Sequence, residues 1–106
     1  LVSSTKLNLV QKNNKKIFTI EVYSSNGKLS TRSEYELKDK DENFEKNEIR
    51  KLYELEKSGK IDYSSKIIET YYENGNLKTR LTDTHVKEKL EEYDENGKLI
   101  RVENGE

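Results

Sequence analysis

Hydrophobic and polar residues alternate along most of this chain, and a period of two predicts β-strands with one buried face. The clearest stretch is 28–38, in which one face carries Leu29, Thr31, Ser33, Tyr35 and Leu37. The same criterion predicts further strands at 5–11, 16–24, 60–72, 76–83, 85–94 and 98–103. The chain contains no Pro, so no strand is barred from a central position by a missing backbone donor.

A repeated turn separates several of these strands. In three copies a Tyr lies four residues before a Gly and a Leu lies two residues after it: Tyr23–Gly27–Leu29, Tyr71–Gly75–Leu77 and Tyr93–Gly97–Leu99. A two-residue Asn-Gly loop would pair each Tyr with the residue three after the Gly, and Ser30, Lys78 and Ile100 share no character. A three-residue loop with a left-handed Gly and a bulge would pair each Tyr with the Leu. The recurrence of Tyr and Leu therefore predicts the bulged loop.

A fourth, degraded copy runs from Tyr53 to Ile61, with two extra residues before Gly59. This repeat frame favours a strand over 48–57. A helix is the alternative, with Asp41 as its cap and Gly59 as its stop, and it would be confined to 41–58. The polar segment 39–47 is interpreted as an insertion.

Together these patterns predict one mainly β domain over 1–106, in which antiparallel hairpin repeats form an elongated, twisted meander sheet with at most one short helix. Only 30% of residues are hydrophobic and the mean hydropathy is −1.12, values that raise the question of disorder. The apolar residues are patterned, however, and seven Tyr supply large amphipathic side chains. We therefore expect a thin sheet with a modest core and marginal stability.

Charge and residue usage exclude several functional classes. The net charge is −1 with both signs interspersed, so the sequence does not predict nucleic-acid binding. No apolar run approaches the roughly 18–20 residues that span a membrane, so it does not predict membrane insertion either. The chain has no Cys and a single His, which excludes a thiolate or multi-histidine metal site. We therefore expect no cofactor.

Three motifs carry candidate chemistry, and each fits an ordinary surface better. Residues 39–43 resemble the first half of a calcium loop, but Phe44 and Arg50 stand where that loop needs Gly and Glu. His85 has Asp83 and Glu88 nearby, yet no nucleophile is indicated. The acidic run 91–95 lies on a strand, where neighbours point to opposite faces. The sequence therefore predicts no catalytic residue.

The three Tyr-x-x-Asn-Gly-Lys-Leu-like copies resemble the bacterial variant of MORN repeats. The resemblance covers roughly 18–101, with 39–47 outside it. It implies antiparallel hairpins stacked into an elongated, twisted sheet, and protein–protein or envelope-associated roles. Some labels within the family refer to antitoxin components.

These observations lead to the hypothesis of a non-enzymatic protein-binding or scaffold module. The alternative is an antitoxin-like regulatory partner of a specific protein. The chain has no Met, so we expect Leu1 to follow a removed leader or an omitted start. The composition suggests a bacterial source, with export to the envelope and a cytoplasmic location both left open.

Candidate partner contacts follow from the predicted last strand. Residues 98–102 carry little charge to protect an exposed edge. Alternation places Leu99 with the repeat tyrosines and leaves Ile100 and Val102 on the other face. Tyr72 follows Tyr71 and is expected on the wetter face. We therefore predict that Tyr72, Ile100 and Val102 contact a protein partner or a second copy of the chain.

Overall fold

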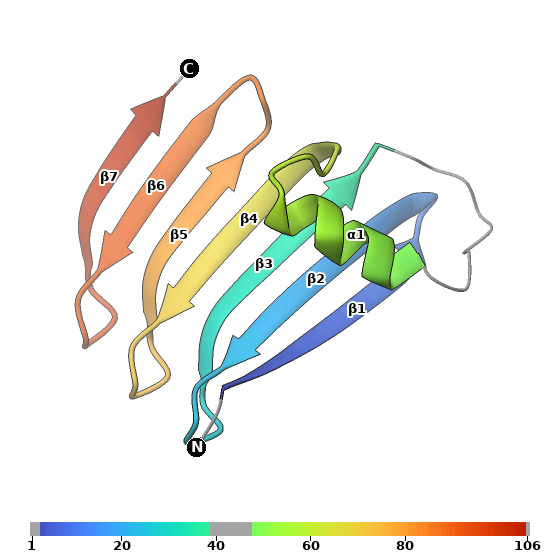
Figure 1. Cartoon of the computed structure of the whole chain (residues 1–106). Coiled ribbons are helices and arrows are strands. Elements are labelled where there is room, and N and C mark those ends of the chain that lie inside the picture. Colours follow the sequence, from blue (N-terminus) through green and yellow to red (C-terminus); the bar gives the residue numbers. More distant parts are fainter. Residues whose placement is uncertain (1–2, 39–47, 106) are drawn as a thin grey trace.

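The computed structural model describes residues 3–38 and 48–105. It contains seven strands and one helix: β1 (Ser4–Lys12), β2 (Lys15–Tyr23), β3 (Leu29–Leu37), α1 (Glu48–Lys57), β4 (Tyr63–Tyr71), β5 (Leu77–Asp83), β6 (Glu88–Tyr93) and β7 (Leu99–Gly105). Every strand pairs antiparallel with its neighbours in sequence, in the order β1 to β7 (Figure 1). The predicted mainly β, antiparallel meander is confirmed.

The sheet is broad and thin. The chain as a whole measures 42 × 40 × 26 Å with a radius of gyration of 15.0 Å, whereas a compact domain of this length has a radius of gyration of about 13 Å. A meander adds each strand to the outer edge of the one before. Here it extends the sheet sideways without folding it onto a second layer.

Residues 48–57 form a helix, so the strand favoured by the repeat frame is wrong. Gly59 has a φ of 74°. It ends the helix in a Schellman motif, in which Lys60 N donates to Leu55 O at 2.8 Å and Gly59 N donates to Glu56 O at 3.1 Å. Because β3 and β4 pair directly, the segment between them has no free strand edge to extend at that point. It buries more apolar surface by packing over one face of the sheet. The proposed cap Asp41 and the calcium-like segment 39–43 lie outside the described residues.

The core lies on one face, between the sheet and α1. Its buried hydrophobic residues are Phe18, Ile20, Tyr35 and Leu37, and the partly buried residues packed against them are Leu7, Leu9, Val22, Leu52, Tyr53, Ile61 and Tyr63. We call this side the helix face and the opposite side the open face. In Figure 1, α1 crosses the strands of the N-terminal half, whereas β5, β6 and β7 extend beyond it. The C-terminal half is therefore a single layer.

A buried ion pair fixes the start of α1. Lys16 is 1% exposed, and its Nζ lies 3.0 Å from Oε1 of Glu48, the first residue of the helix. A carboxylate in the first turn also complements the positive end of the helix dipole. This contact ties the helix to the start of β2, directly above the core.

The repeat turns have the predicted bulged geometry. Tyr23, Tyr71 and Tyr93 lie opposite Leu29, Leu77 and Leu99, respectively. In the middle turn, Gly75 N donates to Tyr72 O and Tyr72 N donates to Asn76 O, both at 2.9 Å. Gly75 has a φ of 92°, and Gly27 and Gly97 are likewise left-handed.

Each of these hairpins carries a second irregularity that the sequence pattern did not predict. The residue after the paired Leu is left without a partner, so Ser30, Lys78 and Ile100 are extra residues in β3, β5 and β7. The residues at these three positions are a Ser, a Lys and an Ile, which share neither polarity nor size. Such variation is expected where no cross-strand contact constrains the side chain. The extra residue reverses the phase of the alternation. Leu29 therefore does not share the face of Thr31, contrary to the expectation from alternation.

Replacing Gly75 with Val should lower the free energy of unfolding by more than about 1 kcal/mol, because a β-branched residue resists positive φ. Apart from Gly75 and its two chain neighbours, nothing lies within 4 Å of the added Cβ, so the cost is conformational. Chemical denaturation measures it. Gly105→Ala is the matched control: this glycine lacks a positive φ, and its added Cβ would lie 3.6 Å from Glu88 Cβ, at ordinary contact distance. Equal stability of the two variants would contradict the strained-turn explanation.

Candidate functional site

One row of charged residues crosses the open face. The strand register places directly opposite one another, in order from β1 to β6, Lys6, Glu21, Arg32, Glu69, Arg80 and Glu91. Their signs alternate across six strands. In β7 the row ends at Val102, opposite Glu91. Arg32 and Glu21 adjoin the core-face residues Ser33 and Ile20, so the row points away from the helix.

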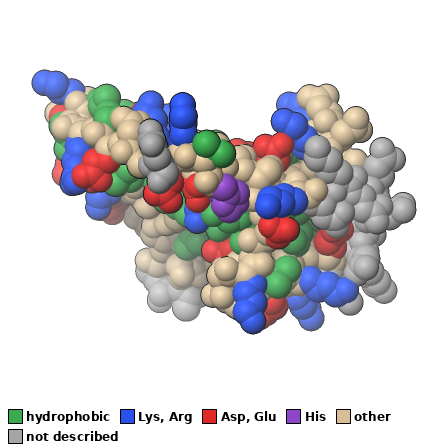
Figure 2. Space-filling model, turned by 90° about the horizontal axis from the view of Figure 1, so that it is seen from above, with side chains coloured by type: hydrophobic (Ala, Val, Ile, Leu, Met, Phe, Trp, Pro, Cys, Tyr) green, Lys and Arg blue, Asp and Glu red, His purple; other side chains and the backbone are tan. Residues whose placement is uncertain are grey.

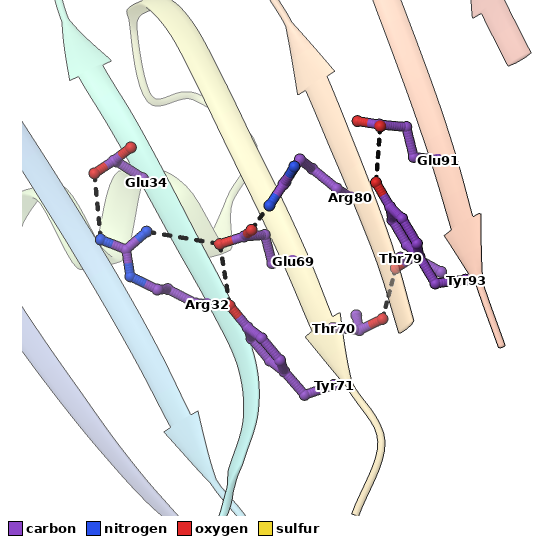
Figure 3. Close-up of polar contacts among 9 residues, drawn as sticks. All are labelled: Arg32, Glu34, Glu69, Thr70, Tyr71, Thr79, Arg80, Glu91 and Tyr93. Atoms are coloured by element: carbon purple, nitrogen blue, oxygen red, sulfur yellow. Dashed lines mark hydrogen bonds and ion pairs between the residues drawn. The ribbon is translucent and has the colours of Figure 1, made fainter. Parts of the chain in front are cut away.

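Glu69 is the centre of the contacts in this row (Figure 3). Its Oε2 lies 3.0 Å from Arg80 Nε and its Oε1 lies 3.9 Å from Arg32 Nη1. The hydroxyl of Tyr71 donates to Glu69 Oε1 at 3.1 Å. In β6, the hydroxyl of Tyr93 donates in the same way to Glu91 at 2.8 Å. Tyr71 and Tyr93 therefore each bind a carboxylate of the row that lies two residues away on their own strand.

Three side chains in and beside this row, Tyr71, Tyr93 and Arg80, have raised pKa values. Burial, and then the neighbouring Glu69, raise the pKa of Tyr71 above its usual value. The hydrogen bond to Glu91 raises the pKa of Tyr93, and the hydrogen bond to Glu69 raises the pKa of Arg80. All three shifts move titration further from pH 7. Tyr71, Tyr93 and Arg80 are therefore unsuited to general acid–base catalysis near neutral pH.

Tyr72 lies at the turn after β4 and links two hairpins. Its hydroxyl donates to Tyr93 O at 2.8 Å, and Lys78 Nζ lies 5.5 Å from the centre of its ring. Asn74 and Asn76 each donate a side-chain amide hydrogen to Glu95 O at 2.8 Å. The sequence analysis missed this internal role, although the recurrence of Asn in the turns was the available signal. The contact of Tyr72 with a partner stays a prediction.

His85 and Asp83 meet, as their spacing suggested, in the turn between β5 and β6. His85 N donates to Asp83 Oδ1 and the Tyr63 hydroxyl donates to Oδ2, both at 2.9 Å. His85 Nε2 lies 2.7 Å from Tyr63 O, and the two rings stack with centres 4.4 Å apart. These donors, His85 N first, lower the pKa of the buried Asp83 carboxyl. The imidazole and the carboxylate are thus both used in closing the turn.

The other candidate chemistry finds no support in the described part of the chain. Residues 3–38 and 48–105 contain no group of three or more His, Cys, Asp or Glu that could hold a metal ion. Glu91 pairs with Arg80 on the open face, whereas Glu92 pairs with Thr79 on the other face, so these adjacent carboxylates do not converge. Figure 2 shows Lys, Arg, Asp and Glu side chains intermixed on the surface seen from above. Among the described residues, no helix is long and apolar enough to span a membrane.

The two edge strands of the sheet differ. β7 pairs with β6 alone among the described strands, and all its residues are exposed. Leu99, Ile100 and Val102 are 45%, 60% and 41% exposed. The only charged residues of β1 are Lys6 and Lys12. β7 also carries two charged residues, Arg101 and Glu103, but these have opposite signs. Lysines on an edge strand discourage strand pairing, whereas residues of opposite charge can face each other across a strand pair.

The register corrects the expected faces of the β7 residues. Val102 lies opposite Glu91, whose carboxylate accepts the Tyr93 hydroxyl hydrogen. Val102 therefore shares the face of the repeat tyrosines, not the opposite one. The extra residue at Ile100 causes this change of phase. Whether Ile100 and Val102 contact a partner stays a prediction.

A family model described as MORN repeat variant matches residues 66–82 and 89–105. The first match covers most of the β4–β5 hairpin and the second covers the β6–β7 hairpin. Comparison with curated proteins and with solved structures finds no match.

Proposed function

Because the chain carries two repeats of the MORN repeat variant family within residues 66–105, we propose that it is a non-enzymatic protein-binding module. In this proposal an extended segment of a protein partner pairs with β7 and continues the sheet. The interaction is strand addition, in which backbone hydrogen bonds supply affinity and alternate side chains supply specificity.

The observation that carries the proposal is the exposure of β7. The strand has one hydrogen-bonding neighbour among the described strands, and α1 does not extend over it (Figure 1). Its apolar side chains are exposed at Leu99, Ile100 and Val102. An edge strand of this kind presents a row of backbone donors and acceptors, which is what strand addition requires.

The remainder of the sheet supports a rigid platform for such an edge. Ion pairs of Glu69 with Arg32 and Arg80 link β3, β4 and β5 across the open face. The Tyr71 and Tyr93 hydroxyls each hold a carboxylate of the row within their own strand. The turn-to-turn bonds from Tyr72 and Asn74 hold successive hairpins in line. A pre-ordered edge lowers the entropic cost of binding.

Capture from lysate of the source cell tests the proposal. Immobilised wild-type chain should retain a protein that Ile100→Lys loses, because a charged residue on an edge strand opposes pairing. Val10→Lys is the matched control: Val10 is similarly exposed but lies on β1. Retention by the wild type and this control, with loss by Ile100→Lys, supports binding at β7. Equal capture by all three would contradict it.

A further inference from the structure

We propose that β7 also pairs with β7 of a second copy, antiparallel, about a two-fold axis that passes beside Val102. This inference rests on the proposed function because it assigns an occupant to the same edge. An isologous contact requires a self-complementary surface, in which each residue pair occurs twice. The sequence of β7 has this property.

Charge complementarity selects the pairing. With Val102 opposite its own copy, antiparallel geometry places Arg101 opposite the second copy's Glu103, and Glu103 opposite the second copy's Arg101. In the single chain Arg101 forms ion pairs with Glu103 of its own strand and with Glu92 of β6, the latter at 3.5 Å, yet Arg101 and Glu103 remain about half exposed and can also face a second copy. Opposite charges directly across a strand pair are stabilising. Two such pairs would flank the apolar contact at the axis.

Neighbouring registers lack this complementarity. Centring the axis on Arg101 places that residue opposite its own copy, and centring it on Glu103 opposes two carboxylates. Like charges directly across a strand pair are destabilising. Of the three registers centred on Arg101, Val102 and Glu103, only the one centred on Val102 places no like charges opposite each other at the axis.

The order of charges along the row of the open face also supports an axis beside Val102. Its signs alternate from Lys6 to Glu91, so the next position in β7 would be expected to hold a cation. It holds Val102. A residue beside a two-fold axis faces its own copy, and a cation there would face a cation. Val102 thus ends the alternation of charges at the position where a charged residue would face its own copy across the axis.

The other edge offers no equivalent arrangement. The charged residues of β1 are both lysines, so self-pairing could not create an opposite-charge pair. Two-fold pairing through β7 would join the two single-layer halves into one continuous sheet, with both helices on the same side. The uncovered halves would then lie next to each other between the helices.

Sedimentation equilibrium of the chain over a range of concentrations tests the inference. The wild type should show a monomer–dimer equilibrium. Val102→Lys should raise the dimer dissociation constant by about tenfold or more, because it opposes two cations at the axis. Within one chain this Lys would lie opposite Glu91 and continue the alternating row, so the fold should persist, which circular dichroism checks. Val86→Lys, at a 73% exposed position outside the strands, should leave the equilibrium unchanged.

Charge reversal tests the register. Glu103→Arg alone places Arg opposite Arg101 of the second copy, and Arg101→Glu alone opposes two carboxylates, so each variant should be largely monomeric. An equimolar mixture of the two should form a heterodimer, in which every such pair is again of opposite charge. Failure of the mixture to associate would overturn the proposed pairing.

Different outcomes would contradict self-pairing through β7 and binding of a different protein at β7. A wild type that remains monomeric at all concentrations, or a dimer unaffected by Val102→Lys, overturns self-pairing. Capture of a different protein at β7, sensitive to Ile100→Lys, would still support the binding module. Conversely, a dimer that dissociates with Val102→Lys, together with capture equal in all variants, supports self-pairing and contradicts a separate partner at this edge.

Discussion

Replacing Phe18 with Ala should lower the free energy of unfolding by about 3–5 kcal/mol, the usual cost of removing a fully buried aromatic side chain. Phe18 is 0% exposed and lies opposite Leu9 in β1 and Tyr35 in β3. The described part of the chain has a core of four buried hydrophobic residues. Since small domains are stable by about 5–15 kcal/mol in total, this loss is expected to leave a large unfolded population.

Urea denaturation followed by circular dichroism measures this effect. Phe18→Leu is the first comparison and should cost less, because it keeps most of the hydrophobic volume. Val86→Ala removes a 73% exposed side chain and should change stability by no more than about 0.5 kcal/mol. A Phe18→Ala variant as stable as Val86→Ala would show that the contact between helix and sheet contributes little to stability.

Raising the pH from below the unfolded pKa of 10 to above the folded pKa of about 12 should remove up to roughly 2.7 kcal/mol of stability through Tyr35 alone. Burial, and then Glu56, raise the pKa of Tyr35 from 10.0 to about 12. The neutral phenol is the form that the folded state favours. Its stabilising contribution is complete below the unfolded pKa and is lost as pH rises through the folded pKa. The midpoint of urea unfolding, measured across this range, reports the loss.

Tyr35→Phe isolates this contribution. The variant keeps the ring in the core and removes the hydroxyl, which lies 3.4 Å from Glu56 Oε1. Its stability should therefore fall less steeply with pH than that of the wild type. Some dependence will remain, because Tyr71 and Tyr93 also have raised pKa values. Parallel curves for the two proteins would contradict the assignment to Tyr35.

The C-terminal half of the sheet shows how strands persist without a covering layer. A two-stranded hairpin is at best marginally stable alone, and a further strand with a packed face is normally needed. Here the β4–β5 hairpin is also tied at its turn to the β6–β7 hairpin, by Tyr72 and Asn74. The charged row adds lateral contacts of modest individual strength. In this arrangement β7 has a single hydrogen-bonding neighbour among the described strands, and both proposals depend on its other edge.

The sequence by itself determined the local geometry of the repeats. Asn-Gly, a Tyr four residues before the Gly and a Leu two after it predicted a bulged hairpin, and the positive φ of Gly75 confirms it. Such features are decided by residues within a few positions of the turn, through φ preferences and one cross-strand pair. Alternation likewise identified Ser33, Tyr35 and Leu37 as one buried face. The strands and their antiparallel order followed from these short-range constraints.

The tertiary structure decided what depends on neighbours distant in the chain. Residues 48–57 fit either a strand or a helix, and packing of Leu52 and Tyr53 on the core favoured the helix. The second bulge moved Val102 to the tyrosine face, because register is a property of two strands and not of one. The charged row joins Arg32 to Glu69 across the helical insertion, so no local pattern could reveal it. Cross-strand pairing, not residue type, brings these charges together.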